Sequence, residues 1–162
     1  MWRALRAESP AGSMTATGIH ILDGLVGLFG RITRVQAQSR RRVLAIDIDD
    51  TTSALLDFEN GMTGYLGTLG ATADDWRLQV FGADGWAEIR PDNRLCIKIG
   101  EAEPEAIVFE RIDTVRAELE AFAAAITGEA PYPVPVDDAV HGVAVMEAID
   151  LAAGEGGAFK VF

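Results

Sequence analysis

The sequence reads GSMTATGIHILDGLVGLFG from Gly12 to Gly30, and this stretch sets the start of the fold. Its apolar residues recur with the period of a helix, so it predicts an amphipathic helix that ends at the glycine. Three hydroxyl side chains before the helix are candidate N-caps, namely Ser13, Thr15 and Thr17. The face opposite the apolar stripe carries His20 and, one turn later, Asp23.

The amino-acid composition limits the classes of protein to which this chain can belong. A chain of 162 residues with 49% hydrophobic and 24% charged residues predicts one globular domain over residues 1–162. The net charge of -11 and the pI of about 4.5 argue against nucleic-acid binding. We expect no membrane span, because no run of about 18 apolar residues occurs. The absence of an apolar signal segment and the single Cys96 fit a cytoplasmic protein, and no Cys and His cluster suggests a metal site.

After Gly30 the pattern becomes extended. About seven short runs joined by turn residues, such as Glu59-Asn60-Gly61, predict a mainly antiparallel sheet, and a further strand is expected at 158–162. One strand is expected over 46–58. Two later helices are expected, one from an Asp113 cap to Gly128 and one from an Asp137 cap to about residue 153, the latter buried on nearly all sides. The fold class is therefore α+β with a large, mainly antiparallel open sheet.

The residues suggest one acid/base candidate. Imidazole titrates near neutrality, so His20 is a candidate general acid/base that Asp23 orients. The structural alternative is a helix histidine that caps a neighbour while Asp23 satisfies a backbone group. Asp47, Asp49 and Asp50 do not predict a cation site, because strand alternation sends the last to the other face. We find no Gly-x-Gly-x-x-Gly turn, no Walker loop and no nucleophile elbow.

Several segments in order carry a resemblance to a known family. They are GSMTATGIHILD (12–23), DTTSALLDFENG (50–61), VFGADGW (80–86), ELEAFAAAITG (118–128) and PVPVDDA (133–139). Together they resemble the C-terminal domain of the glucose-fructose oxidoreductase / inositol dehydrogenase / MocA family. His20 matches the catalytic histidine of that family and Gly18 matches its glycine, whereas Ala16 stands where the family has an aspartate.

The resemblance implies a fold and a function. The family fold joins a Rossmann domain that binds NAD(P) to a C-terminal domain like that of dihydrodipicolinate reductase, with helices on one face of a large sheet. This chain resembles only the second domain, so we expect no cofactor bound by the chain alone. The implied role is to provide substrate contacts and the oligomer interface of a sugar or polyol dehydrogenase. His20 would be the acid/base, and Thr15, Thr17 and Asp23 would contact the substrate.

The expected partners follow from the same resemblance. They are a small-molecule substrate, further copies of the chain bound through the sheet face, and a separate Rossmann-domain chain. The mean hydropathy of +0.14 also suggests apolar surface covered by a second subunit. Two alternatives stay open: a non-catalytic dimerisation or ligand-binding module with Gly64, Gly67 and Gly70 in its interface, and a self-contained enzyme using His20 and Asp23.

Overall fold

The computed structural model describes residues 5–91 and 93–162, and the chain divides into two compact units. The first unit comprises Met1–Thr72 and Val134–Phe162, and the second comprises Ala73–Pro133. None of the helices in the described ranges has the length and apolar character needed to cross a bilayer.

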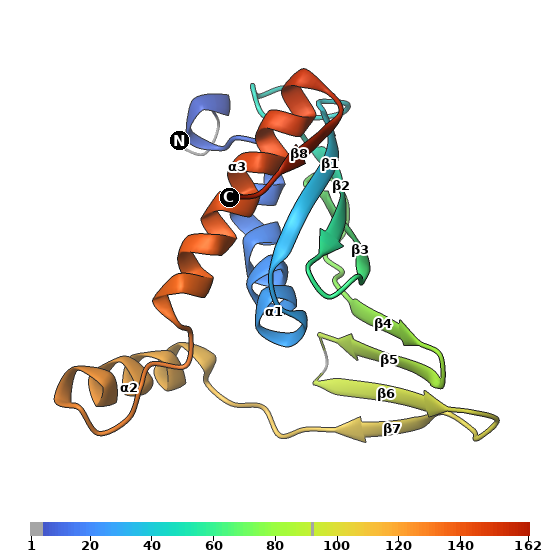
Figure 1. Ribbon diagram of the computed structural model, residues 1–162, viewed down its shortest axis with the longest axis vertical. Coiled ribbons are helices and arrows are strands. Elements are labelled where there is room, and N and C mark those ends of the chain that lie inside the picture. Colours follow the sequence, from blue (N-terminus) through green and yellow to red (C-terminus); the bar gives the residue numbers. More distant parts are fainter. Residues whose placement is uncertain (1–4, 92) are drawn as a thin grey trace. The chain divides into compact units, whose positions relative to one another are not determined.

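The first unit is a four-stranded antiparallel sheet with two helices on one side (Figure 1). Its strands are β1 (Ile32–Arg40), β2 (Thr51–Phe58), β3 (Thr63–Leu69) and β8 (Ala158–Lys160), in the order β3-β2-β1-β8. The helices are α1 (Ile19–Phe29) and α3 (Val136–Glu155). A short 3₁₀ turn (Arg6–Glu8) and a π-helical turn (Met14–Gly18) precede α1. Helix α3 packs on β1, and α1 packs on α3.

The hydrophobic core of the described residues lies entirely in the first unit. Strand β2 shows why, because alternate residues from Thr52 to Phe58 are buried while Leu55 points outward. The largest apolar side chains that are less than 2% exposed are Met14, Leu22, Ile32, Val35, Leu56, Val145 and Ile149. They come from the π-turn, α1, β1, β2 and α3, so these elements are fixed to one another.

The second unit is a four-stranded antiparallel meander followed by one helix. The strands are β4 (Leu78–Gly82), β5 (Gly85–Arg90), β6 (Arg94–Ile99) and β7 (Glu105–Val108), paired in chain order, and the helix is α2 (Thr114–Thr127). None of its described residues is buried. The apolar stripe of α2 is exposed as well, at Val115, Leu119, Phe122 and Ile126.

The α+β class and the antiparallel pairing are confirmed. The hydrogen bonds divide the eight strands into two sheets of four, where the sequence suggested one large sheet. Helix α2 is confirmed at both ends, because the Asp113 carboxylate accepts the Arg116 N–H at 3.0 Å and Gly128 takes the left-handed conformation with φ 76°.

Two expected boundaries are wrong. The strand expected over 46–58 begins only at Thr51, because the residues before it form turns. The last helix begins at Val136 after Pro135 rather than at an Asp137 cap, and proline fits a position that needs no N–H donor. That helix is buried on one face only, since Val140 and Val143 are exposed at 63% and 66%.

Candidate functional site

A π-helical turn, Met14–Gly18, leads directly into α1 and carries the threonines of the predicted site. Its signature is the Ile19 N–H, which donates to the Met14 carbonyl five residues back. Such wide turns are rare and occur often at functional sites. The polar residues of the site therefore lie on a helix start whose backbone departs from the ordinary α-helix.

The threonine hydroxyls bond to carbonyls and do not cap the helix. Thr15 Oγ1 donates to the Pro10 carbonyl, and Thr17 Oγ1 donates to the Ser13 carbonyl at 2.8 Å. Ser13 Oγ donates to Thr68 Oγ1 of β3 at 3.0 Å.

The prediction that these hydroxyls are N-caps is wrong. The N–H groups of Met14 and Thr15 already donate to the carbonyls of Ala11 and Gly12, so a preceding turn satisfies them. Ser13 serves instead to tie the helix start to the sheet.

Two glycines fix the backbone of the helix start. Gly12 has φ +62°, and a Cβ there would lie 1.9 Å from the Asp49 carbonyl oxygen. A Cβ on Gly18 would lie 2.2 Å from Sδ of the buried Met14. Because both positions are tightly packed, the turn is held rigidly against the core of the first unit.

The predicted acid/base residue lies on the exposed side of this anchored helix. His20 is the second residue of α1 and is exposed, as is Asp23 one turn later. Within residues 5–91 and 93–162 neither side chain has a hydrogen-bond or ion-pair partner, so the structure does not join them. Thr17 is exposed and Thr15 is half-buried. The imidazole of His20 is thus accessible to a molecule outside the helix.

The second histidine has a structural role. His141 of α3 is buried, and its Nε2 accepts the Ile32 N–H at 3.0 Å, so it joins α3 to the first strand. Burial lowers the pKa of His141, and the nearby positive charge of Arg31 lowers it further. The neutral ring that results can accept the N–H, whereas an imidazolium could not.

The aspartates at 47–50 are structural as well. Asp49 forms a two-pronged ion pair with Arg6, at 2.6 and 3.0 Å. Asp50 accepts the N–H groups of Arg42, Val43 and Leu44, which holds that turn. In the described part of the chain no group of three His, Cys, Asp or Glu side chains is placed to hold a metal ion.

The described strands do not form a dinucleotide site. Such a site needs parallel strands joined by a helix, with a glycine-rich turn at the helix start. Here every strand pair is antiparallel. The described residues therefore do not form a dinucleotide site of this type.

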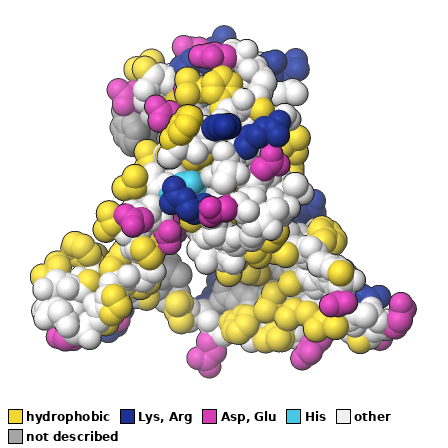
Figure 2. Space-filling model, in the orientation of Figure 1, with side chains coloured by type: hydrophobic (Ala, Val, Ile, Leu, Met, Phe, Trp, Pro, Cys, Tyr) yellow, Lys and Arg dark blue, Asp and Glu magenta, His cyan; other side chains and the backbone are white. Residues whose placement is uncertain are grey.

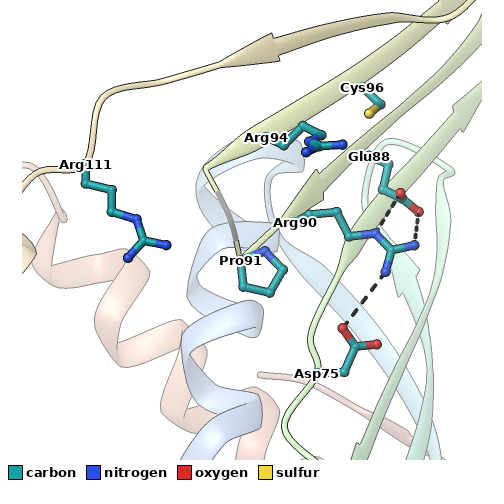
Figure 3. Close-up of a pocket in the computed structure, with 7 residues that line it drawn as sticks. All are labelled: Asp75, Glu88, Arg90, Pro91, Arg94, Cys96 and Arg111. Carbon is teal, nitrogen blue, oxygen red and sulfur yellow. Dashed lines mark hydrogen bonds and ion pairs between the residues drawn. The ribbon is translucent and has the colours of Figure 1, made fainter.

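A polar hollow on the second sheet was not predicted from the sequence. Its lining residues are Asp75, Glu88, Arg90, Pro91, Arg94, Cys96 and Arg111 (Figure 3). One signal was present in the sequence. Arg90 and Arg94 lie on either side of the turn-forming sequence Pro-Asp-Asn, so strands joined there place the two arginines opposite each other, as the observed register does. The sequence does not predict that Arg111 lines the same hollow, because Arg111 lies in a later segment, after β7.

Solved structures with the same fold are oxidoreductases. The chain is 25% identical to the aldose-aldose oxidoreductase of Caulobacter crescentus, solved with glycerol, with a TM-score of 0.85 over 99% of this chain and 50% of that one. Levoglucosan dehydrogenase in complex with NADH is 15% identical, with a TM-score of 0.85 over 100% and 53%. An oxidoreductase of Thermotoga maritima is 19% identical, with a TM-score of 0.83 over 99% and 47%.

The chain thus spans about half the length of these proteins and has the fold of one part of an oxidoreductase. No curated protein sequence matches it. A sequence model of the GFO/IDH/MocA C-terminal domain matches residues 1–88, which is more than half of the chain. The chain belongs to the GFO/IDH/MocA C-terminal domain family.

Proposed function

We propose that this chain forms the substrate-binding and oligomerisation part of an NAD(P)-dependent dehydrogenase of sugars or polyols, with His20 as its acid/base. One observation carries the proposal: an exposed imidazole without a partner in the described residues stands on a rigid helix start, inside the segment that matches the family. A cytoplasmic setting, where thiols stay reduced, suits the single Cys96.

The hydrogen-bonding capacity of the helix start supports a polyhydroxylated substrate. The hydroxyl hydrogens of Thr15 and Thr17 are already donated to carbonyls, so these oxygens offer lone pairs to a ligand. The side-chain oxygens of Asp23 are likewise acceptors. A ligand rich in hydroxyl donors suits this set, and oxidation of its carbinol releases a proton that the His20 imidazole can accept.

Sugar chemistry is also supported by the solved relatives, one named for aldoses and one for levoglucosan. The family implies NAD(P) for the complete enzyme. Because the described residues do not fit a dinucleotide, we propose that another domain or chain holds it. On this proposal the 162-residue chain alone does not turn over substrate.

An apolar sheet face supports the oligomerisation role. The strand registers place Leu78, Ile89, Leu95 and Ile107 in one row across the second sheet, and Val80, Ala87 and Ile97 in the next row on the same face. Among the described residues of the second unit, α2 does not pack on these strands. Hydrophobic side chains gather over the region of β4–β7 on the side that Figure 2 shows. An uncovered apolar face of this kind is typical of an interface, and a second copy is the proposed occupant.

The same face favours one alternative, a non-catalytic dimerisation module. In that case the proposed interface is not the glycines of β3, because they do not share a face. A Cβ on Gly64 would contact the Phe58 ring at 3.2 Å, whereas a Cβ on Gly67 would meet the Tyr65 hydroxyl at 2.7 Å.

The two histidines allow the active-site proposal to be tested by NMR. Glycerol, sorbitol and glucose are titrated into the chain while the ring signals of His20 and His141 are followed. We expect saturable shifts of the His20 signals with at least one of these ligands and none at the buried His141. His20→Asn assigns the signal, and Thr17→Ala should weaken the binding.

Two results would contradict the proposal. One is a set of equal shifts at both rings. The other is the absence of any shift at His20 up to about 100 mM ligand, a concentration at which even very weak binding would be detected. Either result would contradict the substrate-binding role. Micromolar binding of NADH by the chain alone, measured by fluorescence, would show that the cofactor is not held elsewhere.

A further inference from the structure

The polar hollow of the second unit brings three arginines together. Arg90 ends β5 and Arg94 begins β6, and the two residues are direct partners in the antiparallel register. Both side chains project from the face that also carries Glu88 and Cys96, which are partners two positions further along. Like charges placed opposite each other destabilise a strand pair unless an opposite charge lies between them.

The third arginine reaches the same hollow from another segment. Arg111 lies between β7 and α2 and lines the hollow together with the sheet residues (Figure 3). In the part of the chain that the structure describes, its guanidinium has no hydrogen-bond or ion-pair partner. An unpaired cation that lines the same hollow as two other arginines is a feature that the fold of the second unit does not explain.

Two carboxylates hold one of the arginines in place. Glu88 accepts hydrogen bonds from Arg90 Nε at 2.8 Å and from its Nη2 at 3.4 Å, and Asp75 lies 3.9 Å from Nη1. The hydrogen bond and charge of Glu88 raise the pKa of Arg90 above its usual value. The guanidinium is thereby oriented before any ligand arrives, which lowers the entropy cost of binding.

Arginines are concentrated in the hollow within an acidic part of the chain. Residues 73–133 carry six Lys and Arg against thirteen Asp and Glu. Three of those six cations line the hollow, where both lining carboxylates contact Arg90 and Arg94 has an interaction of its own. This clustering of arginines contrasts with the acidic composition of the second unit and with the net charge of -11.

We propose that this hollow binds the oxyanion of a small molecule, a phosphate monoester or a carboxylate, between Arg90, Arg94 and Arg111. Planar guanidinium groups bind such oxyanions through paired N–H donors, and three of them suit a doubly charged phosphate best. The hollow is open to solvent, so the remainder of the ligand extends outward. The site is separate from His20 and does not depend on the proposed dehydrogenase activity.

The test measures binding of inorganic phosphate by calorimetry, using the full chain at low salt. We expect saturable binding that weakens at least about tenfold in Arg111→Gln and in Arg94→Gln. Arg77→Gln is the matched control, since Arg77 is exposed in the same unit and does not line the hollow. Added NaCl should weaken the binding of the unmodified chain.

Cys96 provides a second readout, because it is the only cysteine and lines the hollow. Phosphate should slow its alkylation by iodoacetamide in the unmodified chain and in Arg77→Gln, but not in Arg111→Gln. A sugar monophosphate and a sugar carboxylate are then compared with inorganic phosphate, and the tighter of the two identifies the oxyanion of the ligand.

Either of two results would overturn the proposal. One is the absence of saturable binding of all three anions up to about 10 mM. The other is equal binding by the unmodified chain, Arg94→Gln and Arg111→Gln, which would show only general attraction of anions to exposed charges.

Discussion

Asp50 shows how one buried carboxylate shapes the chain around it. Its two oxygens accept the N–H groups of Arg42, Val43 and Leu44 at distances from 2.6 to 3.1 Å. These hydrogen bonds, that of Leu44 first, lower the pKa of Asp50 from 3.8 to about 2, although burial opposes the shift. The turn after β1 therefore depends on the ionised form of this side chain.

This dependence predicts a pH effect on stability. The folded pKa lies below the unfolded value of 3.8, so the ionised Asp50 stabilises the fold fully above that value, and the contribution is lost as the pH falls through about 2. Asp50→Asn should lower the urea midpoint at pH 7, and the difference from the unmodified chain should shrink towards pH 2.

Asp57→Asn is the control for this effect, because its ion pair with Arg34 is half exposed and such pairs contribute only about 0–1 kcal/mol. An Asp50→Asn midpoint equal to that of the unmodified chain at pH 7 would refute the role given to the carboxylate.

The sequence predicted the positions of the candidate site residues only in part. The sequence predicted His20 and Asp23 on the polar face of a helix, and both are exposed on α1. It did not predict the bonds of Thr15 and Thr17 to carbonyls, because a hydroxyl that can cap a helix can equally bond to the preceding turn.

Helix α2 shows how far local signals can determine an element. Its Asp113 cap and its Gly128 end were both predicted, since each acts within a few residues of itself. In contrast to α1 and α3, it has no buried residue. Its stability within this chain therefore rests on local interactions, such as the Arg116–Glu120 pair at 2.7 Å.

We expect the cap of α2 to be necessary for its helicity. Asp113→Ala removes the acceptor for the Arg116 N–H and should cost about 1 kcal/mol of helix stability, whereas Asp113→Asn keeps an acceptor and should change little. Amide exchange at residues 114–118 reports the effect. Equal amide-exchange rates in the two variants would show that the Asp113 cap does not determine the stability of α2.

The start of α1 shows the opposite case. Its π-turn is held by Ser13 bonding to Thr68, by the fit of Gly12 against Asp49, and by buried Met14. The residues that make these contacts with Ser13 and Gly12 are distant in the sequence. The apolar period predicted the helix, but it could not predict how the helix begins.

At the scale of the whole molecule, the core belongs to one unit. All buried residues of the described ranges lie in the first unit. We expect amide exchange to be slower in β1 and β2 than in β5 and β6, because strands with exposed faces open more readily. Equal protection of both sheets in the isolated monomer would contradict this distribution of stability.

The apolar face of the second sheet should determine the assembly state. Light scattering at tens of micromolar, a concentration at which micromolar affinities are visible, should show a dimer or a larger species. Ile89→Asp places a charge on the apolar face and should give a folded monomer, whereas Gln79→Asp, on the opposite face of β4, should not. A strictly monomeric unmodified chain would refute the proposed interface.

The sequence by itself determined the features that depend on neighbouring residues. It predicted the α+β class, the antiparallel hairpins, the ends of α2 and the family. The first three follow from side-chain period, turn residues and caps, which act over a few positions, whereas the family was recognised from the order of several motifs along the chain.

Only the tertiary structure decided which residues meet across the chain. It placed Asp50 over the turn at 42–44, His141 against Ile32, and Arg111 in the lining of the hollow that Arg90 and Arg94 also line. Such contacts depend on how elements pack and how strands register, and no local pattern encodes them.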